Sequence, residues 1–150
     1  MDNNDGSQGP EGDNPFGPPI CRYTRAQAID EGVLVDVSNP AAEAGFKVPV
    51  ALTGAAWADC VKWSEEDSRR QTPQNESGRL WDVLWMAYVA ISGARRLLDS
   101  LPPESHLLYR LVRVPRGGRA TVPREVTLKL VSGPGDAGEH VITIMLPHED

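Results

Sequence analysis

The sequence predicts an α+β fold: N-terminal helices packed on one face of a roughly four-stranded, mainly antiparallel sheet that ends in a three-stranded meander. Helical segments with capping residues recur between residues 24 and 96. Three strand-like segments then follow, joined by the turn signals Gly117-Gly118 and "SGPGDAGE". Helices first and a meander last are typical of the α+β class. With 150 residues, of which 40% are hydrophobic, the chain is long enough for one domain with a sizeable core.

The first 20 residues differ in composition from the rest. They carry four acids and no Lys or Arg, which gives −4 of the formal net charge of −6. This segment is rich in Gly, Pro and Asn and cannot bury enough apolar area to offset its ordering entropy. We therefore expect residues 1–20 to be a disordered acidic tail and 21–150 a single globular domain. The domain is nearly neutral, with 15 bases and 17 acids, which argues against a DNA mimic and against non-specific nucleic-acid binding.

Helix caps and apolar patterns set the expected elements of the N-terminal part. Thr24 and Gly32 bound a first helix, Thr53 caps a third, and Ser77 is the expected N-cap of a long one. The expected elements are a helix over about 24–31, a strand over 33–37, a helical turn in 38–46, extended chain over 48–52, a helix from 54 to about Trp63, a loop over 64–78 with a turn of helix at 64–70, and a helix from 78 to about Arg96.

The C-terminal part predicts strands over 107–114, 124–131 and 140–146. The strand over 124–131 alternates apolar and polar residues, as a half-exposed antiparallel strand does. The strand over 140–146 is apolar on both faces except for Thr143. Because such a strand at a sheet edge would invite aggregation, we expect the segment 33–37 to lie beside it.

The long helix contains the most apolar stretch of the chain, "GRLWDVLWMAYVAI" at 78–91. Leu80, Leu84, Ala87 and Ile91 form one stripe, and Trp81, Trp85 and Tyr88 form a second. A helix that is apolar nearly all round is expected to be central in the fold.

Asp82 interrupts this stretch, and an unpaired buried carboxylate is costly. One interpretation is an ion pair with Arg79, Arg69 or Arg70 that anchors the loop 64–78 to the helix. The second is a functional acid in a Trp-lined cleft. The third is a carboxylate that faces water. Asp36, inside the strand 33–37, raises the same choice between a cap or turn acceptor and a catalytic acid.

Arginines concentrate in the segment 107–131. Six bases there are opposed only by Glu125, a local charge of +5. This surface is either a solvated face that keeps the sheet soluble or a site for phosphates or an acidic partner. The excess of arginine over lysine favours directional pairing. The residues expected to bind a partner are Arg110, Arg113, Arg116 and Arg119, together with Arg69 and Arg70 of the loop.

The chemistry-bearing residues show no catalytic or ligand-binding spacing. His106, His140 and His148 have no second ligand at metal spacing, and neither Cys21 nor Cys60 belongs to a CxxC. The glycines lie in hairpin turns, so no nucleotide fingerprint is present. We expect no metal, no cofactor and no membrane span. Two cysteines without a disulfide framework favour a reduced cytoplasmic setting.

Four stretches carry a resemblance to a family: "YTRAQAIDEGVLVDVS", "VPVALTGAAWADCV", "ESGRLWDVLWMAYVAI" and "GPGDAGEHVITIMLP". Over residues 23–150 the chain resembles an uncharacterised family of small domains carried on bacterial plasmids and integrative elements. The resemblance implies an accessory role in a mobile element. Inhibitors of host defence, including anti-CRISPR proteins, come from such neighbourhoods, and this link is one of association.

Three functions stay open at this stage. The first is a non-enzymatic interaction protein that binds a host protein or ribonucleoprotein complex, in its concrete form an anti-CRISPR-like inhibitor. The second is a small enzyme acting on a small molecule or nucleotide, with Asp82 or Asp36 as acid or base. The third is a nucleic-acid-binding regulator that uses the basic hairpin, whose signature would be strong salt dependence. The sequence leaves the oligomeric state undetermined.

Overall fold

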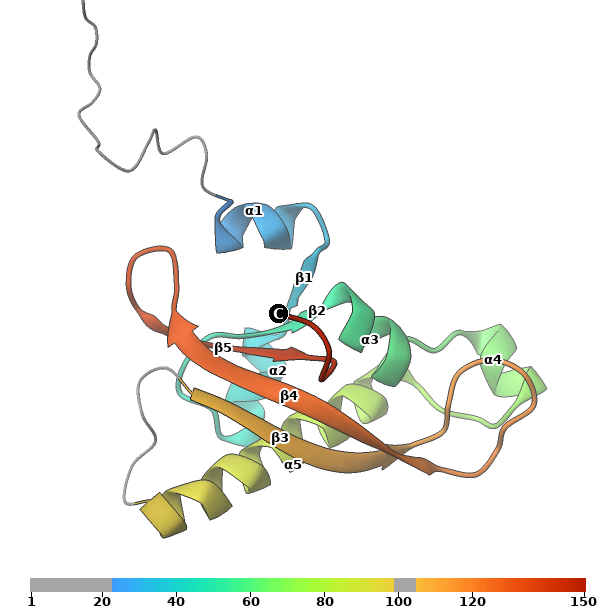
Figure 1. Ribbon diagram of the computed structural model, residues 1–150. Coiled ribbons are helices and arrows are strands. Elements are labelled where there is room, and N and C mark those ends of the chain that lie inside the picture. The colour runs from blue at the N-terminus through green and yellow to red at the C-terminus, as the bar shows by residue number, and fades with distance from the viewer. Residues whose placement is uncertain (1–22, 99–104) are drawn as a thin grey trace, which may run out of the picture.

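A computed structural model describes residues 23–98 and 105–150 of the chain (Figure 1). The described residues form the expected α+β fold, with helices and a mixed sheet. The acidic tail expected at residues 1–20 lies outside the described residues.

The elements follow the expected order along the chain. The helices are α1 (Arg25–Asp30), α2 (Ser38–Ala44), α3 (Gly54–Cys60), α4 (Glu65–Arg70) and α5 (Glu76–Leu98). The strands are β1 (Leu34–Asp36), β2 (Val50–Thr53), β3 (Ser105–Arg113), β4 (Arg124–Pro134) and β5 (His140–Met145). The third helix ends at Cys60 rather than Trp63, and the turn of helix expected in 64–70 is α4.

The described sheet has five strands in the order β1-β2-β5-β4-β3, one more than expected. The meander β3-β4-β5 is antiparallel, as predicted. The interior place of β5 is also confirmed, but its second neighbour is β2 and not β1. β2 runs parallel to β5, with Val50 opposite Ile142, and β1 pairs with the far side of β2. The sequence predicts only extended chain over 48–52, because the four residues of β2 carry too little periodicity to mark a strand.

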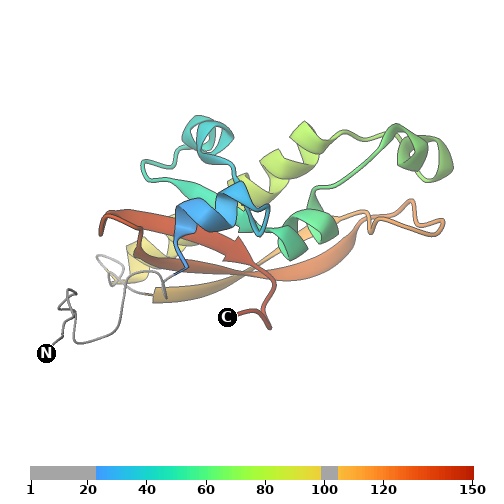
Figure 2. The ribbon, with the colours of Figure 1, turned by 90° about the horizontal axis from the view of Figure 1, so that it is seen from above.

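The helices α2, α3 and α5 lie on one face of the sheet, which Figure 2 shows edge-on. The core between these layers holds fully buried side chains from both, such as Leu84 of α5, Leu128 of β4 and Ile144 of β5. The opposite face of β3 stays open, where Leu108 and Val112 are 61% and 59% exposed.

The long helix α5 is not central, contrary to the expectation from its composition. Its first stripe is buried as predicted, including Leu84 and Ala87. Of the second stripe, Trp81 and Trp85 are 41% and 44% exposed. The helix therefore packs on the sheet with one side only and presents tryptophans on the other. None of the described helices combines the length and hydropathy that a membrane span requires.

Local signals place several of the helix ends. The Thr24 side chain accepts from the N–H of Gln27 in a capping box, and Gly45 ends α2 at a φ of 119°. A Cβ on Gly45 would lie 2.6 Å from the Tyr88 ring, so glycine is required there for space as well as conformation. The cap of α5 is Asn75 rather than Ser77, because the Asn75 Oδ1 accepts from the N–H of Gly78 at 2.7 Å.

Candidate interaction surface

The two acids expected at a functional cleft lie on different elements, Asp82 on α5 and Asp36 on β1. Asp82 is exposed on α5, and among the described residues it has no ion pair with an arginine. Asp36 is exposed at the end of β1, where its Oδ1 accepts from the N–H of Ser38 at 3.2 Å and from the Ser38 hydroxyl at 2.6 Å. These contacts are those of a turn acceptor. The small enzyme with Asp82 or Asp36 in a Trp-lined cleft stays a prediction.

Arg79, expected as a partner of Asp82, is buried and points elsewhere. Its Nε donates to the carbonyl of Val61 at 3.0 Å, and its Nη1 donates to Gln74 Oε1 and to the carbonyl of Val114. The guanidinium lies 4.5 Å from the centre of the Trp63 ring. Burial lowers the pKa of Arg79. Arg79 therefore joins α5 to the ends of α3 and β3.

The carboxylate that does lie inside the protein is Asp67 of α4, only 2% exposed. It accepts from the N–H and hydroxyl of Ser64, which completes a capping box at the start of α4. It also accepts from Arg116 Nε at 2.6 Å and Arg70 Nη2 at 3.3 Å. The hydrogen bond from Arg116, and then that from the Ser64 N–H, hold the pKa of Asp67 well below its ordinary value. The pattern Ser64-x-x-Asp67 is the sequence signal that could have identified it.

Gln71, directly after α4, is a second buried polar residue that sequence reasoning missed. Its Nε2 donates to the carbonyls of Pro115 and Ala120 at 2.8 and 2.7 Å, and its Oε1 accepts from the N–H of Gly117 at 2.8 Å. One amide side chain thus satisfies three backbone groups of the β3–β4 connection. No sequence pattern marks such a contact between segments over 40 residues apart.

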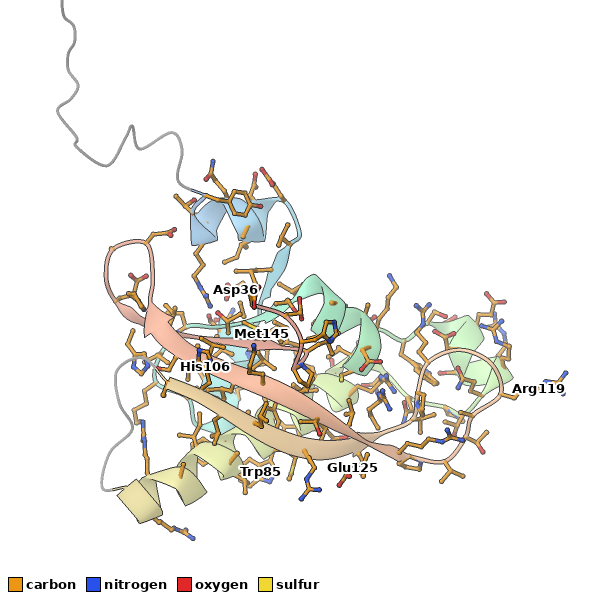
Figure 3. The ribbon with its side chains drawn as sticks, in the orientation of Figure 1. Asp36, Trp85, His106, Arg119, Glu125 and Met145 are labelled. Atoms are coloured by element: carbon orange, nitrogen blue, oxygen red, sulfur yellow. The ribbon has the colours of Figure 1, made fainter. Side chains whose placement is uncertain are left out.

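Asp67 and Gln71 bring two distant segments together in what we call the arginine lobe, residues 64–75 and 114–123. Figure 1 shows α4 and the β3–β4 connection side by side at one end of the molecule. Four of the six arginines predicted to bind a partner belong to this lobe. Arg69 and Arg119 are exposed, and no described carboxylate pairs with either; Arg119 lies at the tip in Figure 3. The other two, Arg70 and Arg116, both contact Asp67.

The remaining two predicted arginines are outside the lobe. Arg113 is largely buried and donates from Nη2 to both carboxylate oxygens of Asp59 on α3, at 3.1 and 3.2 Å. Arg110 pairs loosely with Glu125 at 3.6 Å on the open face of the sheet. Two of the six bases in 107–131, Arg113 and Arg116, are therefore paired with carboxylates from outside that segment.

A groove of about 870 Å³ lies at the other end, between α1, the start of α3, the β4–β5 turn and the last residues. Its polar side chains bond to one another. Arg25 donates to the Thr143 hydroxyl and to the carbonyl of Ile142, and Thr53 donates to Glu149. Asp136 accepts from the first two N–H groups of α1. Neither Asp82 nor Asp36 lines this groove.

Charge is unevenly divided between these two ends. Residues 23–36 and 134–150 hold one arginine against seven acids, a formal charge of −6 with histidine neutral. The arginine lobe holds four arginines against three acids, or +1, and one of those acids is the buried Asp67. No three His, Cys, Asp or Glu side chains of the described residues are grouped as a metal site requires.

These features define a small α+β protein whose most distinctive polar structure is a lobe of arginines held by a buried carboxylate. Residues 18–150 match the family described as "Family of unknown function (DUF6573)", and the chain belongs to that family. No curated protein and no solved structure matched the chain. The plasmid and mobile-element origin expected from the resemblance stays a prediction.

Proposed function

We propose that the protein acts by binding a macromolecular partner through the arginine lobe. The observation that supports this most is the meeting of α4 and the β3–β4 connection, which gathers Arg69, Arg70, Arg116 and Arg119 on one projecting lobe. Arginine is the residue best suited to directional contacts with carboxylates and phosphates. The partner is accordingly an acidic surface of a protein or of a ribonucleoprotein complex.

The buried side chains that hold the lobe in place also fit a binding role. Asp67 and Gln71 are buried within the lobe, and Arg79 is buried at its junction with α5. Their side-chain hydrogen bonds hold both segments of the lobe. A surface that is ordered before binding loses less conformational entropy on association. Arg69 and Arg119, which have no described carboxylate partner, are left to contact the partner.

The test is capture of partners from a bacterial lysate by the tagged full chain and the variant Arg69→Glu/Arg119→Glu. The matched control is Lys47→Glu/Arg95→Glu, which also changes the charge by −4 at two exposed positions outside the lobe. We expect the control to retain a stoichiometric partner and the lobe variant to lose it by about tenfold or more. Equal capture by the two variants would contradict the proposal. Arg113 and Arg116 are unsuited to this test, because their reversal would place a carboxylate against Asp59 or Asp67.

An inhibitor of a host defence complex, carried by a mobile element, is the concrete form of this proposal. It rests on the resemblance of residues 23–150 and not on the geometry of the lobe. The test is a phage or plasmid interference assay in a host with an active CRISPR system. Relief of interference by the wild type and by the Lys47→Glu/Arg95→Glu control, but not by the lobe variant, is the expected result.

Direct binding to nucleic acid is the alternative that the same arginines favour. Contacts to phosphates release counterions, so the affinity would fall steeply as salt rises. Capture that is abolished by nuclease treatment, with a linear dependence of log K on log salt, would identify this alternative. Capture that survives nuclease treatment favours the acidic protein surface.

A further inference from the structure

The side of α5 that faces away from the sheet carries a regular pattern. At 3.6 residues per turn, this side lies opposite the buried residues Leu84 and Ala87. Its members follow one another at spacings of three and four residues, as the contact positions of paired helices do. They are Asp82, Trp85, Val89, Ser92 and Arg96.

The middle of this pattern is apolar and its side chains are ordered. Trp85 and Val89 are each 44% exposed. The Trp85 ring stacks on Trp81 with centroids 6.0 Å apart and on Tyr88 with centroids 5.8 Å apart. Figure 3 shows Trp85 at the border of the molecule. Rigid, exposed aromatic side chains of this kind are enriched at protein interfaces.

Gly93 lies on the same side of α5 and is not required by the fold. A Cβ added there would meet no described atom within 4 Å, and its φ is not in the left-handed region. Glycine disfavours the interior of a helix, so its presence here lacks an explanation within one chain. It leaves a notch on this side of the helix, one turn after Val89.

We propose that a second copy of this chain docks on α5, with the two helices antiparallel and the twofold axis near Val89. Asp82 and Arg96 are each seven residues from Val89, so the axis places Asp82 opposite the partner's Arg96. Trp85 and Gly93 are each four residues from Val89, so Trp85 faces the notch at the partner's Gly93. The surface is self-complementary, as an isologous interface requires.

The charges of Asp82 and Arg96 favour an antiparallel over a parallel pair of helices. They also favour pairing between two chains over pairing within one helix. A parallel pair would place Asp82 opposite the partner's Asp82, and Arg96 opposite the partner's Arg96. Within one helix the two residues are 14 positions apart, or about 21 Å at 1.5 Å per residue, so they cannot pair with each other. One pair of helices buries less area than a standard interface, so we expect dissociation in roughly the micromolar range.

The test is sedimentation equilibrium of the full chain over a range of concentrations. We expect the mass to rise from 16.3 kDa towards twice that value. Each of the single variants Asp82→Arg and Arg96→Asp places like charges opposite each other at two symmetric contacts. Each should therefore weaken the dimer by about tenfold. An equimolar mixture of the two variants restores opposite charges at both contacts, and should dimerise about as tightly as the wild type. The double variant should do the same.

A third variant separates docking from folding. Gly93→Leu fills the notch on an exposed helix side, so it should raise the thermal stability of the monomer while weakening the dimer by about tenfold or more. The lobe variant Arg69→Glu/Arg119→Glu should dimerise like the wild type. A loss of dimerisation can therefore be distinguished from a loss of partner binding by the arginine lobe. A full chain that stays at 16.3 kDa at its highest soluble concentration would overturn the proposal. So would a dimer that neither single reversal weakens, or a mixture that does not restore it.

Discussion

The Asp67 carboxylate contacts three residues of the arginine lobe, Ser64, Arg70 and Arg116, and its ionisation should be visible in the stability of the protein. Its pKa is held below the ordinary value of 3.8 chiefly by the hydrogen bond from Arg116. A group whose pKa is lower in the folded state adds stability above its unfolded pKa, and that stability is lost as the pH falls towards the folded value. We expect the difference in unfolding free energy between the wild type and Asp67→Asn to be constant above about pH 5 and to shrink below it. Urea denaturation from pH 7 to pH 3 measures it, and a difference that stays constant to pH 3 would contradict the assignment.

Gln71 provides a test of the same lobe at neutral pH. Gln71→Leu leaves the carbonyls of Pro115 and Ala120 and the N–H of Gly117 without their side-chain partner. We expect a loss of about 2 kcal/mol in unfolding free energy, since part of this backbone can be rehydrated. Gln71→Glu should cost a similar amount, because a carboxylate cannot donate to the two carbonyls. A loss below about 0.5 kcal/mol for both variants would mean that Gln71 does not hold the connection.

Cys60 gives a residue-level probe of native-state opening. It is fully buried, and burial together with Asp59 raises the pKa of its thiol to about 12. Because the thiolate is the reactive form, the native thiol should resist modification at neutral pH. In a Cys21→Ser background we expect labelling at pH 7 to be about a hundredfold or more slower in buffer than in denaturing urea. Rapid labelling of the folded protein would show that α3 opens readily.

At the scale of elements, the start of α5 can be tested with two neighbouring substitutions. Asn75 caps the helix, whereas Ser77 lies inside it and is exposed. Asn75→Ala should therefore lower the unfolding free energy by about 1 kcal/mol. Ser77→Ala should leave it unchanged or raise it slightly, because alanine is the better helix former. Denaturant unfolding of both variants measures this contrast, and the reverse order of effects would contradict the assignment of Asn75 as the cap.

Element boundaries could be predicted where the signal is local. Thr24 and Gly45 act through their own side chain or backbone within a few residues, so the sequence identifies them. Asn75 and Ser77 both fit the pattern of a cap, and only the position of the first helical turn separates them. The burial of α5 was predicted on one side and wrongly on the other. Composition alone does not show that Trp81 and Trp85 face away from the sheet, because their outward placement depends on which side of the helix the sheet covers.

At the scale of the whole molecule, the parallel pairing of β2 with β5 could not be predicted. Val50 and Ile142 are adjacent in the sheet but separated by most of the chain, and no local pattern records such a contact. The same holds for the arginine lobe, where Gln71 and Asp67 meet a connection more than 40 residues away. The arginines were identified from the sequence as a group, while the buried carboxylate that positions two of them was not. Asp82, which interrupts the most apolar stretch of the sequence, lies on the exposed side of α5.

The central place of β5 means that the N-terminal helices and the C-terminal strands should unfold together. Ile144 is fully buried and lies between Leu52 of β2 and Leu130 of β4. Ile144→Ala removes buried methylene and methyl groups, and should lower the unfolding free energy by about 3 kcal/mol. All four tryptophans lie in residues 57–85, far along the chain from this substitution.

If the sheet and helices form one cooperative unit, tryptophan fluorescence and far-ultraviolet circular dichroism should report the same shifted transition in this variant. Leu108→Ala, at an exposed position of β3, is the control and should change the unfolding free energy by no more than about 0.5 kcal/mol. Fluorescence and dichroism transitions that separate in Ile144→Ala would show that the helices retain structure without the β2–β5 pairing. The coincidence of the two transitions would show that this long-range parallel contact couples both ends of the chain in a single folding unit.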